Sequence, residues 1–250
     1  MGETRTLAQF VAELRHESLP ASVVEQACLI IADTVGCALS AWREDPEKAR
    51  VAHELAKLYP STAGASVIGA ADVSAQPAIA AFANGILVNA ADNDDTHKLA
   101  LLHTGSVVVP TVLALAQTER LSGRELILAL VAGYEVAVRV GTAVMPTHYR
   151  FWHSTGTNGT FGAAASAAKA FRLDVLSTQT ALGLAGTQAA GLNTFFESGD
   201  MTKSIHPGKP PATASSQPNW LDWEPPPHRP CSSIPRGISM RTRPSPNQRH

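Results

Sequence analysis

Apolar residues recur at helical spacing along most of this 250-residue chain, and a large share of them are alanine. The spacing of Leu7, Phe10, Val11 and Leu14, for example, is that of one helical face. Hydrophobic residues make up 44% of the chain and charged residues only 16%, which suits helices that are covered on several sides. The sequence therefore predicts an all-α fold with one substantial core.

Local start signals divide this background into separate helices. Pro20 and Pro46 stand where a first helical turn begins. Ser122 and Glu125 form a capping box ahead of a long apolar run, and Asp174 is a further N-cap. We expect a loop over residues 61–69, and helices over residues 7–14, 20–42, 46–58, 78–89, 106–118, 124–144, 155–171 and 175–190.

The composition of the chain changes after residue 209. Ten of its 17 prolines fall in residues 210–250, where no apolar periodicity remains. Such a segment is not expected to fold. We predict a helical domain over residues 1–209 and a Pro-rich, disordered tail over residues 210–250. Our hypothesis for the tail is translation in a shifted reading frame, and a natural Pro-rich linker is the alternative.

Charge and cysteine content bear on partners and location. The formal net charge is −1 and no basic stripe appears, which argues against a nucleic-acid partner. Charged residues interrupt the longest apolar stretches, so we predict neither a membrane span nor a signal peptide. Cys28 and Cys37 lie on opposite faces of one expected helix, too far apart for a disulfide. With Cys231 as the third cysteine, we expect a cytoplasmic location.

Three polar segments interrupt the apolar background. Residues 92–105 combine three carboxylates with two imidazoles, residues 151–162 place His153 beside glycines, and residues 202–209 contain Lys203. Carboxylates and imidazoles that lie close together shift one another's pKa, so one group can accept a proton while another donates. Glycines let backbone amides approach a ligand. These segments are the candidate site.

In this order, the three segments resemble the MmgE/PrpD family, whose members include 2-methylcitrate dehydratase, cis-aconitate decarboxylase and iminodisuccinate epimerase. The resemblance runs from about Leu7 to Lys209. It rests on the motifs Asp-Asp-Thr-His, His-x-Thr-Gly-Thr-x-Gly-Thr-Phe-Gly and Thr-Lys-x-x-His-Pro-Gly. Asn93 and Thr104 stand where many relatives carry an aromatic residue and a proline. Those departures leave the identity of the substrate open.

The resemblance implies a helical N-terminal domain of this family, with the family's smaller α+β covering domain missing. It also implies a cofactor-independent lyase that acts on a small di- or tricarboxylate. The low charge and the many alanines of the chain favour a homo-oligomer, which we expect to be a homodimer. A divalent metal held by Asp92, Asp94, Asp95, His97 and His103 is the chemical alternative, but the segment lacks a His-Asp dipeptide and the final carboxylate of an Asp-Asp-x-x-Asp motif, so we expect no metal. The catalytic residues that the resemblance implies are Asp92, Thr96, His103, His153 and Lys203. The predicted substrate-binding residues are His206, Thr155, Thr157 and Gly159.

In the expected mechanism Asp92 is the general base, His103 or His153 is the acid, and Lys203 binds a substrate carboxylate. Dehydration of the 2-methylcitrate type is the predicted reaction, and decarboxylation and epimerisation are the alternatives. An inactive, oligomerising helical remnant is an alternative of another class. If the helix over residues 78–89 continued by a turn, Asp92 would share a face with Asp95 and Thr96.

Overall fold

The computed structural model describes residues 2–210 and 214. Within these residues the chain is mostly helical, as expected, and it also contains one antiparallel hairpin. The predicted tail over residues 210–250 lies outside the described residues, apart from Pro210 and Ala214, which are buried. The missing covering domain stays a prediction. In chain order, with η for a 3-10 helix, the elements are α1 (Glu3–Glu13), η1 (His16–Ser18), α2 (Ala21–Glu44), α3 (Pro46–Lys57), β1 (Pro60–Val67), β2 (Ala70–Ala75), α4 (Pro77–Val88), α5 (Gly105–Thr118), α6 (Gly123–Val144), η2 (Thr147–Arg150), α7 (Ser154–Ala170), α8 (Val175–Gln188), α9 (Phe195–Ser198) and α10 (Thr202–Ile205).

Helix starts are confirmed where the sequence carries a local signal. The Ser122 hydroxyl accepts from the backbone N–H of Glu125, whose carboxylate accepts from the N–H of Ser122, so the capping box of α6 is complete. Asp174 accepts from the N–H of Ser177 at the start of α8. Pro46 occupies the first turn of α3. These starts depend on groups within three residues of one another, which is why the sequence predicts them.

The prediction of a loop over residues 61–69 is wrong, because β1 and β2 pair there as a hairpin. Alanine, serine and glycine are weak strand formers, so neighbouring helices decide the conformation. The backbone N–H of Ser66 donates to Oε1 of Gln117 from α5 at 2.9 Å. The N–H of Ile68 donates to Oδ1 of Asn84 from α4 at 2.8 Å. These contacts correct the all-α prediction to a helical body with one hairpin.

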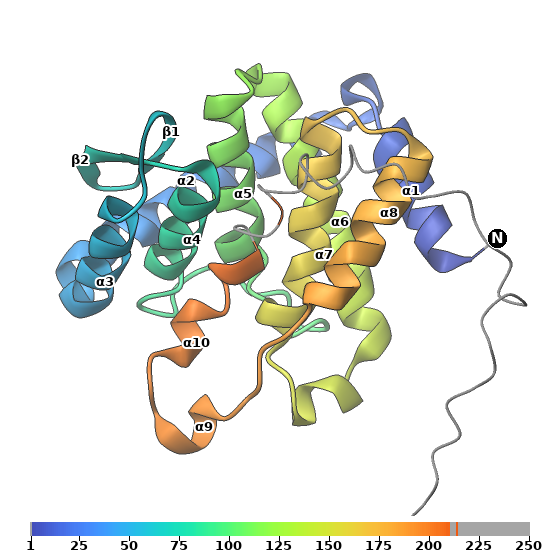
Figure 1. Cartoon of the computed structure of the whole chain (residues 1–250). Helices are drawn as coiled ribbons and strands as arrows, with labels where there is room; N and C mark the ends of the chain where they lie inside the picture. The colour runs from blue at the N-terminus through green and yellow to red at the C-terminus, as the bar shows by residue number, and fades with distance from the viewer. Residues whose placement is uncertain (1, 211–213, 215–250) are drawn as a thin grey trace, which may run out of the picture.

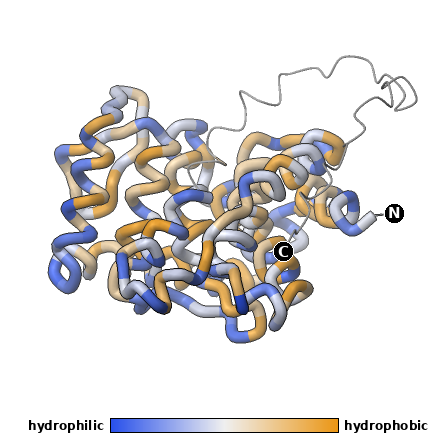
Figure 2. Tube along the Cα trace, turned by 60° about the horizontal axis from the view of Figure 1, so that its bottom comes forward, coloured by the Kyte–Doolittle hydropathy of each residue, from blue (hydrophilic) through white to orange (hydrophobic). Residues whose placement is uncertain are grey.

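Helices α4, α5, α7 and α8 follow one another across the molecule, with α6 against α7 (Figure 1). The hairpin and α3 lie beside α4, and α1 lies against α8. Glycines let α6 and α7 approach closely: a Cβ on Gly133 would overlap the hydroxyl of Ser166, and one on Gly162 would lie 2.7 Å from Cβ of Ala137. Figure 2 shows hydrophobic and hydrophilic positions interleaved along the trace, as expected for helices with one buried face.

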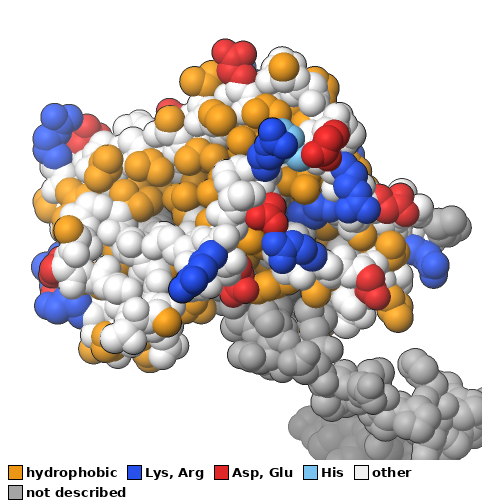
Figure 3. Space-filling model, turned by 90° about the horizontal axis from the view of Figure 1, so that it is seen from above, with side chains coloured by type: hydrophobic (Ala, Val, Ile, Leu, Met, Phe, Trp, Pro, Cys, Tyr) orange, Lys and Arg blue, Asp and Glu red, His pale blue; other side chains and the backbone are white. Residues whose placement is uncertain are grey.

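Two described helices, α2 and α6, are long and apolar enough to cross a membrane. The core helix of a soluble protein passes the same test, and 44% of the relevant window of α6 is buried, against 17% for α2. On the face shown in Figure 3, hydrophobic side chains gather toward one side and charges of both signs are interspersed. The absence of a membrane span and of a nucleic-acid partner, the homodimer and the cytoplasmic location stay predictions.

Cys28 and Cys37 both lie on α2 as free thiols, which confirms that they do not bridge. Burial raises the pKa of the Cys37 thiol to about 11, with help from the charge of nearby aspartates, so this thiol stays protonated at neutral pH. Cys231 lies outside the described residues.

Candidate active site

The polar segment that begins at Asp92 forms the loop between α4 and α5. Asp92 adopts a left-handed backbone conformation, with φ of 57°, which short polar residues tolerate better than most. The helix extension that would place Asp95 and Thr96 on the face of Asp92 is therefore wrong. The loop folds back on itself, since His97 and Leu102 pair through their backbones.

Asp95 anchors this loop to the interior of the protein. Its carboxylate accepts from the backbone N–H of Gly105, the first residue of α5, at 2.7 Å and from the Tyr134 hydroxyl of α6 at 3.1 Å. A Cβ on Gly105 would lie 2.4 Å from Oδ1 of Asp95 and 2.8 Å from Oγ1 of Thr34, so any other residue here would displace these side chains. Burial raises the pKa of Asp95, while the hydrogen bonds from Gly105 and Tyr134 oppose the rise. The role of Asp95 is therefore to fix the start of α5 beside the loop.

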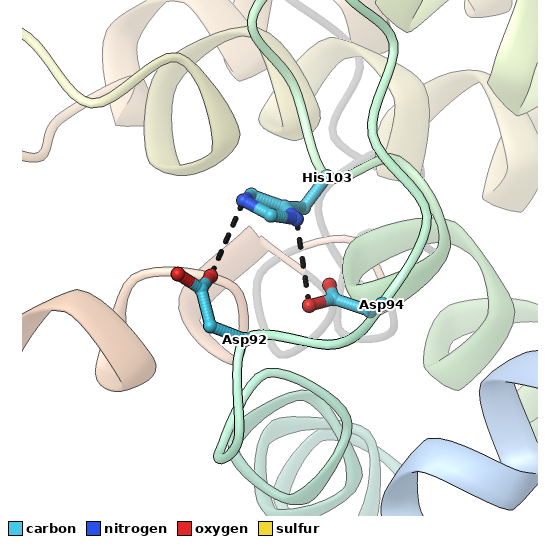
Figure 4. Close-up of side chains that lie close together, drawn as sticks. All are labelled: Asp92, Asp94 and His103. Carbon is cyan, nitrogen blue, oxygen red and sulfur yellow. Dashed lines mark ion pairs between the residues drawn. The ribbon is translucent and has the colours of Figure 1, made fainter.

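His103 lies between two carboxylates (Figure 4). Its Nε2 is 3.4 Å from Oδ1 of Asp92, and its Nδ1 is 3.4 Å from Oδ1 of Asp94. Asp94 is buried and accepts from Nδ2 of Asn89 at 2.9 Å. Burial raises the pKa of Asp94 to about 6, although the charge of His103 and the hydrogen bond from Asn89 lower it. Oγ1 of Thr96 lies 3.2 Å from the same Nδ1 of His103, so three polar side chains surround one imidazole.

Lys203 reaches the loop from α10, much later in the chain. Its Nζ lies 2.5 Å from Oδ2 of Asp92, so this carboxylate is held between Lys203 and His103. A close backbone crossing brings the two segments together. A Cβ on Gly85 of α4 would lie 2.7 Å from Cα of Gly208, which follows α10. Two glycines far apart in the sequence thus set the position of the lysine.

His153 is the N-cap of α7 and is only 1% exposed. Its Nδ1 lies 3.1 Å from Nδ1 of His206, and the ring of Phe195 meets it edge to face. Burial lowers the pKa of His153 to about 3, and the charges of His206, His103 and Lys203 lower it further. His153 is therefore neutral near pH 7. The charges of His103 and Lys203, which also contact Asp92, act on His153 as well.

The remaining predicted binding residues lie in the first turns of α7, where they are buried. Oγ1 of Thr155 accepts from the backbone N–H of His103 at 3.2 Å, which ties α7 to the loop. Oγ1 of Thr157 lies 2.7 Å from Nε2 of His148. Gly159 faces α5, where a Cβ would lie 2.9 Å from the nearest side chain. These contacts hold the start of α7 in place, and substrate binding by the three residues stays a prediction.

Asp92, Asp94 and His103 together also offer the ligand atoms of a cation site. One oxygen each from Asp92 and Asp94 and one nitrogen of His103 lie within 4.8 Å of one another. However, Lys203 already neutralises Asp92 at 2.5 Å, and a divalent ion would have to compete with that ammonium group. The described residues therefore fit an ion-pair network better than a metal centre.

A family model, the MmgE/PrpD N-terminal domain, matches residues 5–215. The chain belongs to the MmgE/PrpD family. The expected resemblance is thereby confirmed over a slightly longer range than residues 7–209. The site described above comes entirely from the part of this MmgE/PrpD chain that the family model covers.

Curated relatives of this MmgE/PrpD chain include cis-aconitate decarboxylase-like protein oryM of Aspergillus oryzae, which is 34% identical over 202 residues, 76% of this chain and 40% of the relative. Cis-aconitate decarboxylase of Aspergillus terreus is 30% identical over 218 residues, 83% of this chain and 43% of the relative. Cis-aconitate decarboxylase of Homo sapiens is 29% identical over 214 residues, 82% and 43% respectively. The chain thus spans about two fifths of the length of these relatives.

Sequence reasoning left the roles of some site residues open or did not foresee them. Asp94 and Asp95 belong to the polar segment of residues 92–105 without an assigned role, and the structure gives them different partners. Asn89 and Tyr134 were not predicted to take part at all. A polar residue within an otherwise apolar helix face was the available signal for Tyr134, whose hydroxyl needs a partner when buried.

Proposed function

We propose that this chain provides the site of a cofactor-independent lyase for a small di- or tricarboxylate, with decarboxylation of a cis-aconitate-like acid as its reaction. The predicted dehydration of the 2-methylcitrate type becomes the second candidate, because the relatives named above are cis-aconitate decarboxylases or decarboxylase-like. Epimerisation of an iminodisuccinate-like acid is the third. All three reactions act on a carbon beside a carboxylate.

The proposal rests on one observation: Lys203 and His103 both contact the carboxylate of Asp92. The two groups come from distant parts of the chain and point at one spot, where the side chain of Asp92 is 52% exposed. Donors that grip a protein carboxylate in this way can also bind a substrate carboxylate beside it, with charge-assisted hydrogen bonds. A polyanionic substrate needs such cationic partners.

In decarboxylation, Lys203 binds a carboxylate that stays on the substrate. The bond between the leaving carboxylate and its neighbouring carbon breaks, and its electron pair is delocalised toward the remaining carboxylate as CO2 departs. His103 then delivers a proton to the carbon that carried the leaving carboxylate. Because negative charge grows on the carboxylate held by Lys203, the ammonium group stabilises the transition state more than the substrate.

In dehydration, the same groups act in another order. Asp92 removes a proton from carbon, a C–O bond breaks, and His103 protonates the departing hydroxide so that water leaves and a double bond forms. The placement of the Asp92 carboxylate next to the imidazole of His103 favours this route as the second candidate, because a base and an acid lie within one small group.

The test is an assay of this chain with cis-aconitate, 2-methylcitrate and iminodisuccinate in D2O, followed by NMR. We expect CO2 release from cis-aconitate with one deuteron on the product carbon. Lys203→Met should lower kcat/KM roughly 10- to 100-fold, the loss expected from a hydrogen bond to a charged group worth about 1.5–3 kcal/mol. The matched control is Lys57→Met, because Lys57 is an exposed lysine of α3 that pairs with Glu54, three residues earlier on the same helix.

Three results would overturn the proposal in different ways. Equal effects of the two lysine substitutions would remove Lys203 from the site. Turnover of 2-methylcitrate alone would replace decarboxylation by dehydration. Neither turnover nor calorimetric binding of any of the three acids would favour the inactive helical remnant.

A further inference from the structure

A second group of basic side chains lies where the end of α1 meets the end of α7. A hollow of about 220 Å³ opens there, and its lining includes Arg15, Lys169, Arg172 and Glu125. Lys169 stands near the opposite end of α7 from His153, roughly 24 Å away at the rise of an α-helix. The hollow is therefore separate from the candidate active site, and three cations against one carboxylate give it a positive charge.

The end of α1 holds Lys169 in place. Its Nζ donates to the backbone oxygen of Val11 at 2.9 Å and to that of Ala12 at 3.0 Å. Helix α1 has no basic residue in its last turn, so this ammonium group satisfies carbonyls that the helix leaves without a partner. An ammonium group has three N–H donors. Among the described residues the third donor of Lys169 has no partner, so it is available to a ligand.

Glu125 fixes Arg172 but leaves most of the positive charge of the hollow uncompensated. Nη2 of Arg172 lies 2.5 Å from Oε1 of Glu125. The other carboxylate oxygen accepts from the backbone N–H and the hydroxyl of Ser122, at 2.8 Å each. Hydrogen bonds from Ser122 and Arg172 lower the pKa of Glu125 to about 2, so this carboxylate stays ionised. Both of its oxygens are engaged, and it neutralises one cation of the three.

Arg15 is the cation that lacks a counter-charge. It is exposed just past the end of α1, and no carboxylate in the described part of the chain forms an ion pair with it. Burial, together with the positive charge of Arg15, lowers the pKa of Lys169 to about 8. The negative pole of α1 explains why Lys169 lies there, but it does not explain a second cation beside it. An anion between the two would turn their repulsion into attraction.

We propose that Arg15, Lys169 and Arg172 form a second anion site, which takes a small oxyanion such as a phosphate group or the carboxylates of a small polyacid. Each of the three side chains offers a charge-assisted hydrogen bond. Two of them are already held by protein partners, so binding orders little more than Arg15. A bound anion connects the end of α1 to the end of α7. This site does not depend on the proposed function.

The test is titration of the 15N-labelled chain with inorganic phosphate and, separately, with citrate at low salt, followed through the backbone amide signals in NMR spectra. We expect saturable shifts at the ends of α1 and α7, which are distinct from any shifts near Lys203. Arg15→Gln should raise the Kd for these shifts roughly tenfold, through loss of one charge-assisted hydrogen bond. The matched control is Arg43→Gln, because Arg43 is an exposed arginine of α2 whose Nη2 lies 3.0 Å from Glu44; it should leave this Kd unchanged.

Saturation by either anion at the ends of α1 and α7 supports the site, and the tighter binder of the two identifies the ligand as a polycarboxylate or a phosphate group. No saturable shift at these ends in the unmodified chain would overturn the proposal and leave the cations with a helix-capping role only. Equal weakening by Arg15→Gln and Arg43→Gln would also overturn it. The shifts are measured without turnover, so a failure of the proposed function leaves this result unchanged.

Discussion

Asp94 makes the stability of this protein depend on pH, and the substitution Asp94→Asn isolates that dependence. Burial raises the pKa of Asp94 from 3.8 to about 6. Because a pKa unit is worth about 1.4 kcal/mol, the ionised carboxylate costs the folded state roughly 3 kcal/mol near neutral pH. Asparagine has the same shape and keeps an oxygen for Nδ2 of Asn89, but it carries no charge.

The sign follows from which state binds the proton. The folded pKa lies above the unfolded one, so the favourable contribution of the protonated acid is complete below about pH 4 and is lost as pH rises through about 6. We therefore expect Asp94→Asn and the parent chain to be equally stable near pH 4. Near pH 7 the variant should be more stable by roughly 3 kcal/mol, yet less active, because Nδ1 of His103 loses its anionic neighbour.

The assay is urea unfolding of both chains at several pH values, with the difference between them plotted against pH. The difference removes the part of the Asp95 titration that the two chains share, since burial also raises the pKa of Asp95. Asp174→Asn is the control of opposite sign, because the hydrogen bonds from Ser177 lower the pKa of that exposed N-cap. A stability difference for Asp94→Asn that is the same at pH 4 and pH 7 would refute the reasoning.

Four further substitutions test helix packing, capping and the anchoring of the site loop. Gly133→Ala should lower the unfolding free energy by about 1–3 kcal/mol, because the new methyl group overlaps the Ser166 hydroxyl of α7. Gly183→Ala should raise the unfolding free energy by about 0.5–1 kcal/mol, because Gly183 has open space around it. Thermal midpoints of the two variants that move in the same direction would contradict this pair of predictions. Ser122→Ala should cost about 1 kcal/mol through loss of the cap of α6, and an unchanged urea midpoint would show that the cap is not stabilising. Tyr134→Phe should cost about 1–3 kcal/mol, because the buried Asp95 loses a donor, and a neutral effect would mean that another group replaces the hydroxyl.

The helices could largely be read from the sequence, since their signals are local. A capping box such as Ser122 with Glu125 joins groups three residues apart, and apolar spacing reports the buried face directly. The hairpin of β1 and β2 could not be found in this way. Its backbone partners Asn84 and Gln117 lie on helices that follow it in the chain, and its own residues have little strand preference.

For the candidate site, the sequence by itself determined which segments carry the polar groups and, through the family motifs, their membership in the MmgE/PrpD family. It did not determine how the groups pair. Only the tertiary structure brought Lys203 to Asp92, gave Asp94 rather than Asp95 to His103, and set His206 against His153. The physical reason is that such pairings depend on burial and on close backbone crossings between segments far apart in the chain, and neither property is encoded in the spacing of neighbouring residues.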